Sequence, residues 1–263
     1  QDNSYENSYP ANFTIDNIYS WNGKTPNLAW SDWAFYSSDT ITQQSLYAAT
    51  RLSLADPLHM IIGARYTTWN AAYSMERKPT DRRYNREEDL TPYAGIIYDI
   101  NDTWSAYASY TSIFQPTEQR DVNSIFLAPT TGHSYEAGVK ADWFNTRLTT
   151  SLAVFRTEQK NTPVEVKGAY IPDSGNQAVY ESKDAVSRGI EFELNGALTD
   201  NWQLTFGATR YIAEESDGSA FNSDQPRTTA KLFTSYKVPA LPDLTVGGGV
   251  NWQNKTWQSV DFG

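Results

Sequence analysis

The feature of this sequence that most constrains its fold is a two-residue alternation of apolar and polar side chains, which recurs from about residue 43 to residue 253. Successive side chains of a β-strand point to opposite sides of a sheet, so each such segment has one apolar and one polar face. In the clearest case Trp202, Leu204 and Phe206 share one face, while Gln203 and Thr205 share the other. We therefore expect an all-β chain.

The alternating segments predict ten strands, and their lengths indicate the kind of sheet. They are about ten residues long, which is what a tilted strand needs to cross a bilayer. Strands of soluble sheets are shorter, usually about five or six residues. The predicted strands cover residues 43–55, 58–69, 91–100, 103–113, 134–143, 146–157, 188–198, 202–213, 226–237 and 244–253.

The connections between these strands alternate in length. Short ones lie at 55–57, 101–102, 143–145, 199–201 and 239–243, and long ones at 70–90, 114–133, 158–187 and 214–225. Short turns at one end and long loops at the other are typical of antiparallel outer-membrane barrels, in which the short turns are periplasmic. Aromatic residues beside the strand ends are expected to form the interfacial girdles: Trp69, Tyr93, Trp104, Trp143, Trp202 and Trp252.

An alternative architecture is a soluble β-sandwich or jelly roll. Aromatic side chains also fill such sheets, and aromatic loops would then stack on sugar rings in a glycan-binding module. The persistence of the long and short connections through all the hairpins favours the barrel.

Composition excludes several classes of function. The 263 residues carry 21 basic and 31 acidic side chains, a net charge of −10, which disfavours nucleic-acid binding because phosphates need a basic face. Cysteine is absent, so disulfides, cysteine–zinc sites and thiol chemistry are excluded. Of the two histidines, neither His59 nor His133 can be placed in a Ser-His-Asp arrangement, and we expect no enzyme. The mean hydropathy of −0.60 excludes a bundle of membrane helices.

Several runs resemble TonB-dependent siderophore receptors: LADPLH at 54–59, YASYTSIFQP at 107–116, SYEAGVK at 134–140 and SRGIEFEL at 187–194. Two further runs, TDNWQLTFGATRY at 199–211 and VGGGVNWQN at 246–254, resemble most the ferric coprogen and rhodotorulic acid receptors of enteric bacteria. In this order the runs cover most of residues 43–254, and residues 1–42 match more loosely.

The resemblance implies a 22-stranded transmembrane barrel in the bacterial outer membrane, closed by an N-terminal plug. Such receptors bind ferric hydroxamate siderophores and import them with energy from the TonB complex. The sequence shows no plug, no TonB-contacting segment and no closing C-terminal strand. We therefore expect residues 1–263 to be an internal part of the barrel domain, about ten of its strands, with TonB acting through the missing plug. Membrane lipid, lipopolysaccharide, and phages or colicins that use the outer loops are further expected partners.

The chemistry that the resemblance implies is binding rather than bond-making. A siderophore brings iron already wrapped in hydroxamate oxygens, so we expect no cofactor and no metal ligands from the protein. The scarcity of histidine and cysteine agrees with this expectation. The binding site needs a concave surface with aromatic faces and a few donors, for which arginine suits hydroxamate and carbonyl oxygens.

Three segments supply such residues. Between residues 19 and 36 an aromatic wall for the ligand is predicted from Trp21, Trp30, Trp33 and Tyr36, although an interfacial girdle or packing within the loop explains them too. In the charged loop 75–89 the candidates are Arg82, Arg83 and Tyr84. Contact with lipopolysaccharide phosphates, or a solvated mixed-charge loop, are the other interpretations of that segment. The loop after the YASYTSIFQP run adds Phe114, Gln115 and Arg120.

Charged residues on the polar strand faces predict which side of the sheet meets lipid. A Lys or Arg facing lipid costs about 2–4 kcal/mol at mid-membrane. The charged set is therefore expected to face the barrel lumen, where it pairs with the plug or is solvated: Arg51, Arg65, Glu136, Lys140, Glu191, Glu193 and Lys231.

Overall fold

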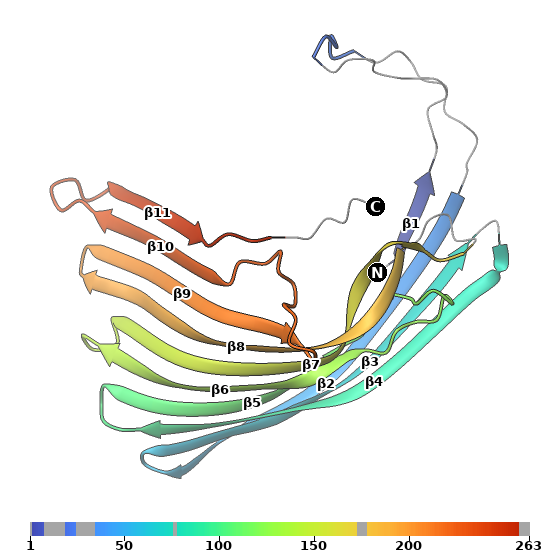
Figure 1. The fold of residues 1–263 in the computed structure, drawn as a ribbon. Helices are drawn as coiled ribbons and strands as arrows, with labels where there is room; N and C mark the ends of the chain where they lie inside the picture. The colour runs from blue at the N-terminus through green and yellow to red at the C-terminus, as the bar shows by residue number, and fades with distance from the viewer. Residues whose placement is uncertain (1, 8–18, 25–34, 76–77, 173–177, 258–263) are drawn as a thin grey trace.

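The computed structural model describes residues 2–7, 19–24, 35–75, 78–172 and 178–257. Within them eleven strands form one antiparallel sheet, in which each strand pairs with its neighbours in sequence (Figure 1). The strands are β1 (Asp2–Asn7), β2 (Phe35–Ala55), β3 (Leu58–Met75), β4 (Lys78–Asp99), β5 (Trp104–Gln115), β6 (Thr130–Trp143), β7 (Leu148–Tyr170), β8 (Ala178–Thr199), β9 (Trp202–Glu215), β10 (Thr228–Lys237) and β11 (Thr245–Gln253). The described residues contain no helix of the length and apolarity that a membrane crossing needs.

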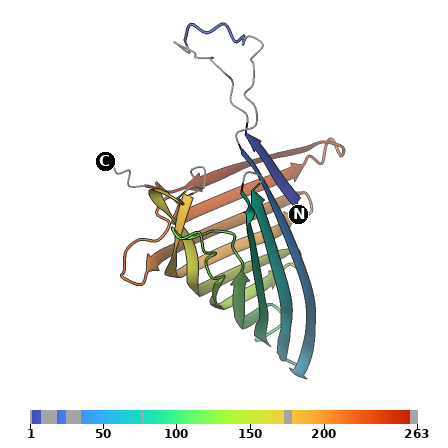
Figure 2. The ribbon, with the colours of Figure 1, turned by 90° about the vertical axis from the view of Figure 1, so that its right-hand side faces the viewer.

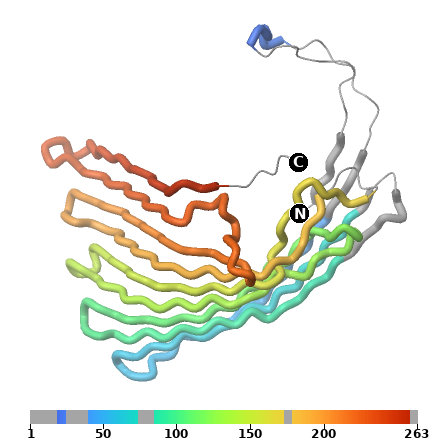
Figure 3. Tube along the Cα trace, in the orientation of Figure 1, coloured from blue at the N-terminus to red at the C-terminus, as the bar shows by residue number. Residues whose placement is uncertain are grey.

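The sheet is a single curved layer. Figures 1 and 2 show it bent into a trough, with β1 and β11 at its two edges. The tube in Figure 3 follows the same curvature along the Cα trace. The prediction of an all-β antiparallel sheet with ten strands is confirmed, and β1 is an eleventh strand at its edge. A sandwich needs two stacked sheets, and the described residues form one, so the sandwich alternative is wrong.

The two ends of the sheet differ as the spacing predicts. At one end the strands are joined by short turns, such as Asp56-Pro57 between β2 and β3 and Asp200-Asn201 between β8 and β9. The other end carries longer connections, including 116–129 between β5 and β6 and 216–227 between β9 and β10. We refer to these as the short-turn end and the loop end.

Two of the predicted long loops are mostly strand. The segment 70–90 belongs to β3 and β4, apart from residues 76–77, and most of 158–187 belongs to β7 and β8. The sequence missed these extensions because the alternation of apolar and polar residues stops where neither face meets lipid. Backbone hydrogen bonding continues there without any hydrophobic pattern.

The register assigns every side chain to one of two faces. Residues paired across antiparallel strands lie on the same face, and the pairing carries one polar face through β2 to β10. As predicted, that face holds Arg51, Arg65, Glu136, Lys140, Glu191, Glu193 and Lys231. It is the concave face: the segment after β5 lies inside the trough (Figure 1) and contacts Tyr73, which shares its face with Arg65.

The convex face carries an exposed apolar band. Its members include Leu46, Ile96, Leu152, Val154, Ile190, Leu232 and Val250. On β4 the band runs from Leu90 to Tyr98, a length of about 27 Å at about 3.4 Å per residue. An apolar band about 25 Å tall is what an outer membrane barrel presents to lipid.

Toward the loop end the convex face carries charged side chains, and several of them form ion pairs. Arg156 lies 2.8 Å from Glu158, and the next strand carries Arg188, whose guanidinium lies 3.4 Å from the carboxylate of Glu214. On β4 Arg86 pairs with Glu88 at 3.5 Å. These pairs mark the outer limit of the lipid-facing surface.

The predicted aromatic girdle is confirmed in part. Trp104 and Trp143 meet edge to face at the short-turn end, 5.3 Å between ring centroids, on the convex side. The indole of Trp202 donates to Thr234 at 2.7 Å on the same side. Trp69 and Tyr93 instead lie on the concave face, so their assignment to the girdle is wrong. An aromatic residue near a strand end does not by itself reveal its face, because both faces of a barrel strand accept aromatic rings.

Tyrosine rings on the concave face lie over glycines of the neighbouring strand. Tyr107 pairs with Gly138, and a Cβ at Gly138 would lie 2.8 Å from the Tyr107 ring and 2.6 Å from the Leu152 carbonyl oxygen. Tyr93 covers Gly63 in the same way. Each glycine leaves room for a ring that shields the exposed backbone, a known means of fixing register in curved sheets.

Candidate ligand-binding site at the loop end

The connection between β5 and β6 folds back onto the concave face and forms a compact strap, residues 116–129. A small hairpin lies within it: Arg120 and Phe126 form an antiparallel bridge, and the Leu127 N–H donates to the Gln119 carbonyl at 2.9 Å. The Tyr180 N–H of β8 donates to the Arg120 carbonyl at 2.8 Å. The strap thus contacts a strand three places away from β5 in the sheet.

Arg120 anchors the strap on its other side. Its guanidinium carbon lies 4.1 Å from the centroid of the Tyr73 ring on β3 and 4.9 Å from that of Phe126. The Arg120 side chain is 9% exposed, and Tyr73 is 6% exposed. A guanidinium stacked on aromatic faces is attracted to the ring electrons more strongly when desolvated. The strap therefore ties β3 to the β7–β8 hairpin across the concave side.

The tip of the strap is a tight turn organised by Asp121. Its Oδ1 accepts the N–H groups of Asn123 at 2.9 Å and Ile125 at 2.8 Å. Its carbonyl accepts the Ser124 N–H at 2.9 Å, and Ser124 has a positive φ of 66°. Aspartate favours such turns because its short side chain mimics the backbone acceptor.

The β7–β8 and β9–β10 connections build a second packed region at the loop end. Ala185, Ala213 and Phe221 form its buried apolar core. Above it the Lys183 ammonium lies 3.0 Å from Glu215 and 3.4 Å from Glu181. Hydrogen bonds to Glu215 and then Glu181 raise the pKa of Lys183, so the ammonium stays charged. This region gives the outer part of β8, including Tyr180, a fixed position beside the strap.

The predicted ligand-contact residues are placed unevenly by the structure. Trp21 is 41% exposed, and its indole donates to the Lys24 carbonyl at 3.0 Å within a turn. Trp30 and Trp33 lie outside the described residues. For four others the backbone alone is described: Tyr36 in β2 opposite Glu6, and Arg82, Arg83 and Tyr84 in β4, the last two opposite Tyr73 and Ala72. The interpretation of 75–89 as a loop is wrong for residues 78–89, which are strand.

The residues at the end of β5 separate onto two faces. Gln115, opposite Thr130, lies on the concave face, whereas Phe114, opposite Thr131, lies on the convex face. A ligand inside the trough can meet Gln115 from β5, and Phe114 faces away from it. Among the predicted residues whose side chains the structure describes, Arg120 is the one found in a dense network of concave-side contacts. The sequence does not predict the contacts of Arg120 with Tyr73 and Tyr180. Tyr73 lies in a predicted loop, and the contact with Tyr180 is a backbone hydrogen bond that side-chain chemistry does not indicate.

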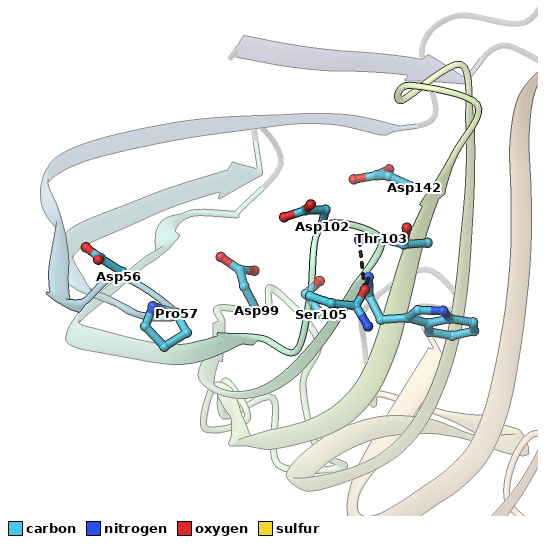
Figure 4. Close-up of a pocket in the computed structure, with 9 residues that line it drawn as sticks. Asp56, Pro57, Asp99, Asp102, Thr103, Ser105 and Asp142 are labelled. Carbon is cyan, nitrogen blue, oxygen red and sulfur yellow. Dashed lines mark hydrogen bonds between the residues drawn. The ribbon is translucent and has the colours of Figure 1, made fainter.

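A separate hollow of about 500 Å³ lies on the concave side at the short-turn end (Figure 4). Four carboxylates line it: Asp56, Asp99, Asp102 and Asp142. The His59 imidazole lies 3.2 Å from Asp99. Among the described residues no group of three or more His, Asp or Glu side chains is arranged to hold a metal ion. The hollow lies at the opposite end from the strap and is distinct from the candidate site.

Comparison with known proteins identifies the family. The family described as TonB dependent receptor-like, beta-barrel matches residues 1–263. The chain is 38% identical over 254 residues to the ferric-pyoverdine BN7/BN8 receptor of Pseudomonas putida, covering 92% of this chain and 29% of that receptor. It therefore spans less than a third of that relative's length. The narrower likeness to coprogen receptors is not established by these matches.

Solved structures share the fold. The ferripyoverdine receptor of Pseudomonas aeruginosa, bound to ferripyoverdine, superposes with a TM-score of 0.79 at 32% identity, covering 95% of this chain and 33% of that one. The FpvAI–pyocin S2 complex gives the same TM-score and identity, with 96% and 34% covered. Relatives in this family are outer-membrane receptors for transport, not enzymes. The one-layer trough with its convex apolar band is thus a stretch of barrel wall, and the chain belongs to the TonB-dependent receptors of the bacterial outer membrane.

Proposed function

We propose that the protein binds a ferric siderophore at the loop end of its concave face and imports it with energy from the TonB complex. The observation that carries the proposal is the match of the whole chain to a receptor family whose relatives include ferric-pyoverdine receptors. The structure supports it with a polar concave wall and a strap held on that wall at its outer end.

The ligand class that we propose is a hydroxamate siderophore of the coprogen type. Its iron arrives fully chelated, so the protein supplies no resident cofactor and no ligand to the metal. Hydroxamate and carbonyl oxygens accept hydrogen bonds from arginine and amide donors. Gln115 is a suitable amide donor because it is exposed on the concave face at the end of β5. Trp21, Trp30, Trp33, Tyr36, Arg82, Arg83 and Tyr84 remain proposed contacts.

We propose the remaining partners from the chemistry of the convex face and of the loop end. The convex apolar band is proposed to contact membrane lipid, and the charged side chains beyond it to meet lipopolysaccharide. TonB is proposed to act through a plug contributed by the rest of the receptor. A bacteriocin is a second proposed ligand of the loop end, favoured by the likeness to the FpvAI–pyocin S2 complex.

Uptake of iron-55 tests the function and its specificity together. The full-length receptor is expressed in a strain lacking its own siderophore receptors, and cells are given ferric coprogen, ferrioxamine B or ferripyoverdine. We expect energy-dependent accumulation with at least one complex, strongest with coprogen, and none in a strain without a working TonB complex. Uptake of ferripyoverdine alone would overturn the hydroxamate assignment, and absence of uptake with every complex would overturn the receptor function.

A further inference from the structure

We propose that three arginines on the convex face, Arg156, Arg188 and Arg210, form a binding site for a phosphate group of lipopolysaccharide. We call these three residues the arginine cluster. The site gives residues to the lipopolysaccharide contact proposed above and depends on that proposal. It does not depend on which siderophore the receptor takes up, because the siderophore is proposed to bind on the opposite face of the sheet.

The members of the arginine cluster are neighbours on β7, β8 and β9. Arg156 is the Cα partner of Arg188. Arg210 is the Cα partner of Ile190, which lies two residues from Arg188 along β8. Side chains directly opposite each other in antiparallel strands have Cβ atoms about 5 Å apart, and diagonal neighbours lie about 7–8 Å apart. Three guanidinium groups on side chains of this length are close enough to approach one anion.

The protein supplies fewer carboxylates than arginines at this cluster. The Arg156 Nε donates to Glu158 at 2.8 Å, and the Arg188 guanidinium lies 3.4 Å from Glu214. Within the described part of the chain, no carboxylate forms an ion pair with Arg210. Like charges placed opposite each other across strands destabilise a sheet. The cluster therefore gains stability from an anion that comes from outside the protein.

The surroundings of the cluster indicate where that anion comes from. Val154 and Ile190, which belong to the exposed apolar band, lie beside the cluster on its membrane side. Further strands of a barrel continue the wall around the lumen, so they leave its convex face outermost. The short turns of such barrels are periplasmic, so the loop end meets the outer leaflet of the membrane. The abundant anions of that leaflet are the phosphates of lipopolysaccharide, which arginine binds through charge-assisted hydrogen bonds.

Aromatic rings continue the same row of the sheet beside the cluster. Tyr135 is the Cα partner of Arg156, and Tyr110 is the partner of Tyr135, with 5.4 Å between the two ring centroids. The Tyr110 ring also stacks on His133 at 5.6 Å, and a hollow of about 360 Å³ opens beside these two residues. Aromatic faces beside a hollow suit the packing of a sugar ring. This arrangement favours a phosphorylated glycolipid over a phospholipid.

The test measures binding of fluorescently labelled lipopolysaccharide to the delipidated full-length receptor in detergent. The triple variant Arg156→Gln/Arg188→Gln/Arg210→Gln should raise Kd at least about tenfold, because guanidinium–phosphate hydrogen bonds are lost. Lipopolysaccharide stripped of its phosphates should bind the wild type as weakly as the intact lipid binds the variant. Arg147→Gln is the matched control: Arg147 pairs with Asp200 at 2.7 Å at the short-turn end, and its replacement should leave Kd unchanged.

Replacement of the same three arginines by lysine separates charge from damage to the wall. Lysine keeps the positive charge and binds phosphate as a point charge, so the lysine variant should bind lipopolysaccharide at least about threefold more tightly than the glutamine variant. Heat-modifiable migration on gels confirms that each variant is folded before binding is compared. A folded lysine variant as weak as the glutamine variant would overturn the phosphate contact.

Phosphatidylglycerol, which carries a phosphate without a sugar, serves as the second ligand. Equal Kd values for the two lipids would overturn the assignment to a glycolipid. Wild-type Kd for lipopolysaccharide in the glutamine variant would refute the arginine cluster as the site and leave lipopolysaccharide as a partner. Absence of binding by the wild-type receptor would refute that partner as well. Iron-55 uptake by the same cells reports on the siderophore function separately and should be unchanged by the glutamine substitutions.

Discussion

At the scale of single residues, the fold depends on positions where a side chain is absent. Gly138 lies under the Tyr107 ring, and the Tyr107 hydroxyl donates to Glu136 at 2.5 Å. The Lys140 ammonium lies 4.8 Å from the centroid of the same ring. The absence of a side chain at Gly138 therefore allows the Tyr107 ring to cover the backbone. In that position Tyr107 also binds the Glu136 carboxylate and lies against the Lys140 ammonium.

We expect Gly138→Ala to destabilise the barrel by about 1–3 kcal/mol, since an added methyl in a filled space forces its neighbours to move. The new Cβ would lie 2.6 Å from the Leu152 carbonyl oxygen, which backbone pairing holds in place. The measurement is the midpoint of heat-induced unfolding of the full-length receptor in detergent.

Gly207 supplies the matched control for this change. It lies on the same face in β9, where a Cβ meets nothing within 4 Å. Gly207→Ala should therefore leave the midpoint of heat-induced unfolding equal to that of the wild type within experimental error. Equal midpoints for the Gly138 and Gly207 variants would show that the Tyr107 contact does not stabilise the fold.

At the scale of single elements, each strand combines a lipid-facing part with an extension beyond the membrane. In β7 the convex face carries Leu152 and Val154 in its lipid-facing part and the charged pair Arg156 and Glu158 beyond it. The pairing with β8 continues past this limit to Tyr170, with register shifts between Gln159 and Thr162 and between Val166 and Tyr170. The strand is one element of backbone with two different environments for its side chains.

Because Leu152 and Ser151 of β7 lie on opposite faces, we expect an arginine at these two adjacent positions to have very different effects on stability. Leu152 is 43% exposed on the convex band, and Ser151 next to it faces the concave side opposite Lys140 and Glu193. Leu152→Arg should destabilise the receptor by about 2–4 kcal/mol, because the charge meets lipid. Ser151→Arg should have a much smaller effect because water and the Glu193 carboxylate are available to its charge.

The measurement for this pair is the fraction of full-length receptor that folds into lipid vesicles across a urea series. Wild-type behaviour of Leu152→Arg together with a severe loss for Ser151→Arg would reverse the assignment of the two faces. The substitutions are matched in charge and in depth along the strand, so a general effect of arginine cannot produce the expected difference.

At the scale of the whole molecule, the described sheet has two open edges. β1 and β11 each pair with one neighbour among the described residues, and β11 is exposed along its length. Unpaired backbone groups in lipid cost several kcal/mol each, so membrane barrels close on themselves. The described strands therefore require further strands to form a stable membrane unit.

We expect the 263-residue chain expressed alone to form no heat-modifiable barrel in vesicles and to aggregate through its edges. The full-length receptor under the same conditions should migrate differently before and after boiling, as closed barrels do. Gel mobility before and after boiling measures whether a closed barrel forms, and light scattering measures aggregation. A monodisperse, heat-modifiable 263-residue chain would contradict the need for additional strands.

Much of this structure was available from the sequence, because a strand that separates lipid from water must alternate in polarity. The alternation predicted the all-β class and the shared face of Arg51, Glu136 and Lys231, and the connection lengths predicted the antiparallel order and the short-turn end. Where both faces of a strand meet water, the polarity pattern does not indicate a strand. The sequence therefore predicts loops where β3, β4, β7 and β8 extend beyond the membrane.

The candidate site was decided by tertiary structure. Sequence chemistry pointed to Arg120 as a donor for the ligand, but only the fold brings it over Tyr73, 47 positions earlier in the chain, and against the backbone of Tyr180, 60 positions later. Local polarity determines which face a strand residue takes, because lipid and water act on each residue separately. Which distant strands a strap joins depends on the curvature of the sheet and on packing between segments that no local pattern encodes.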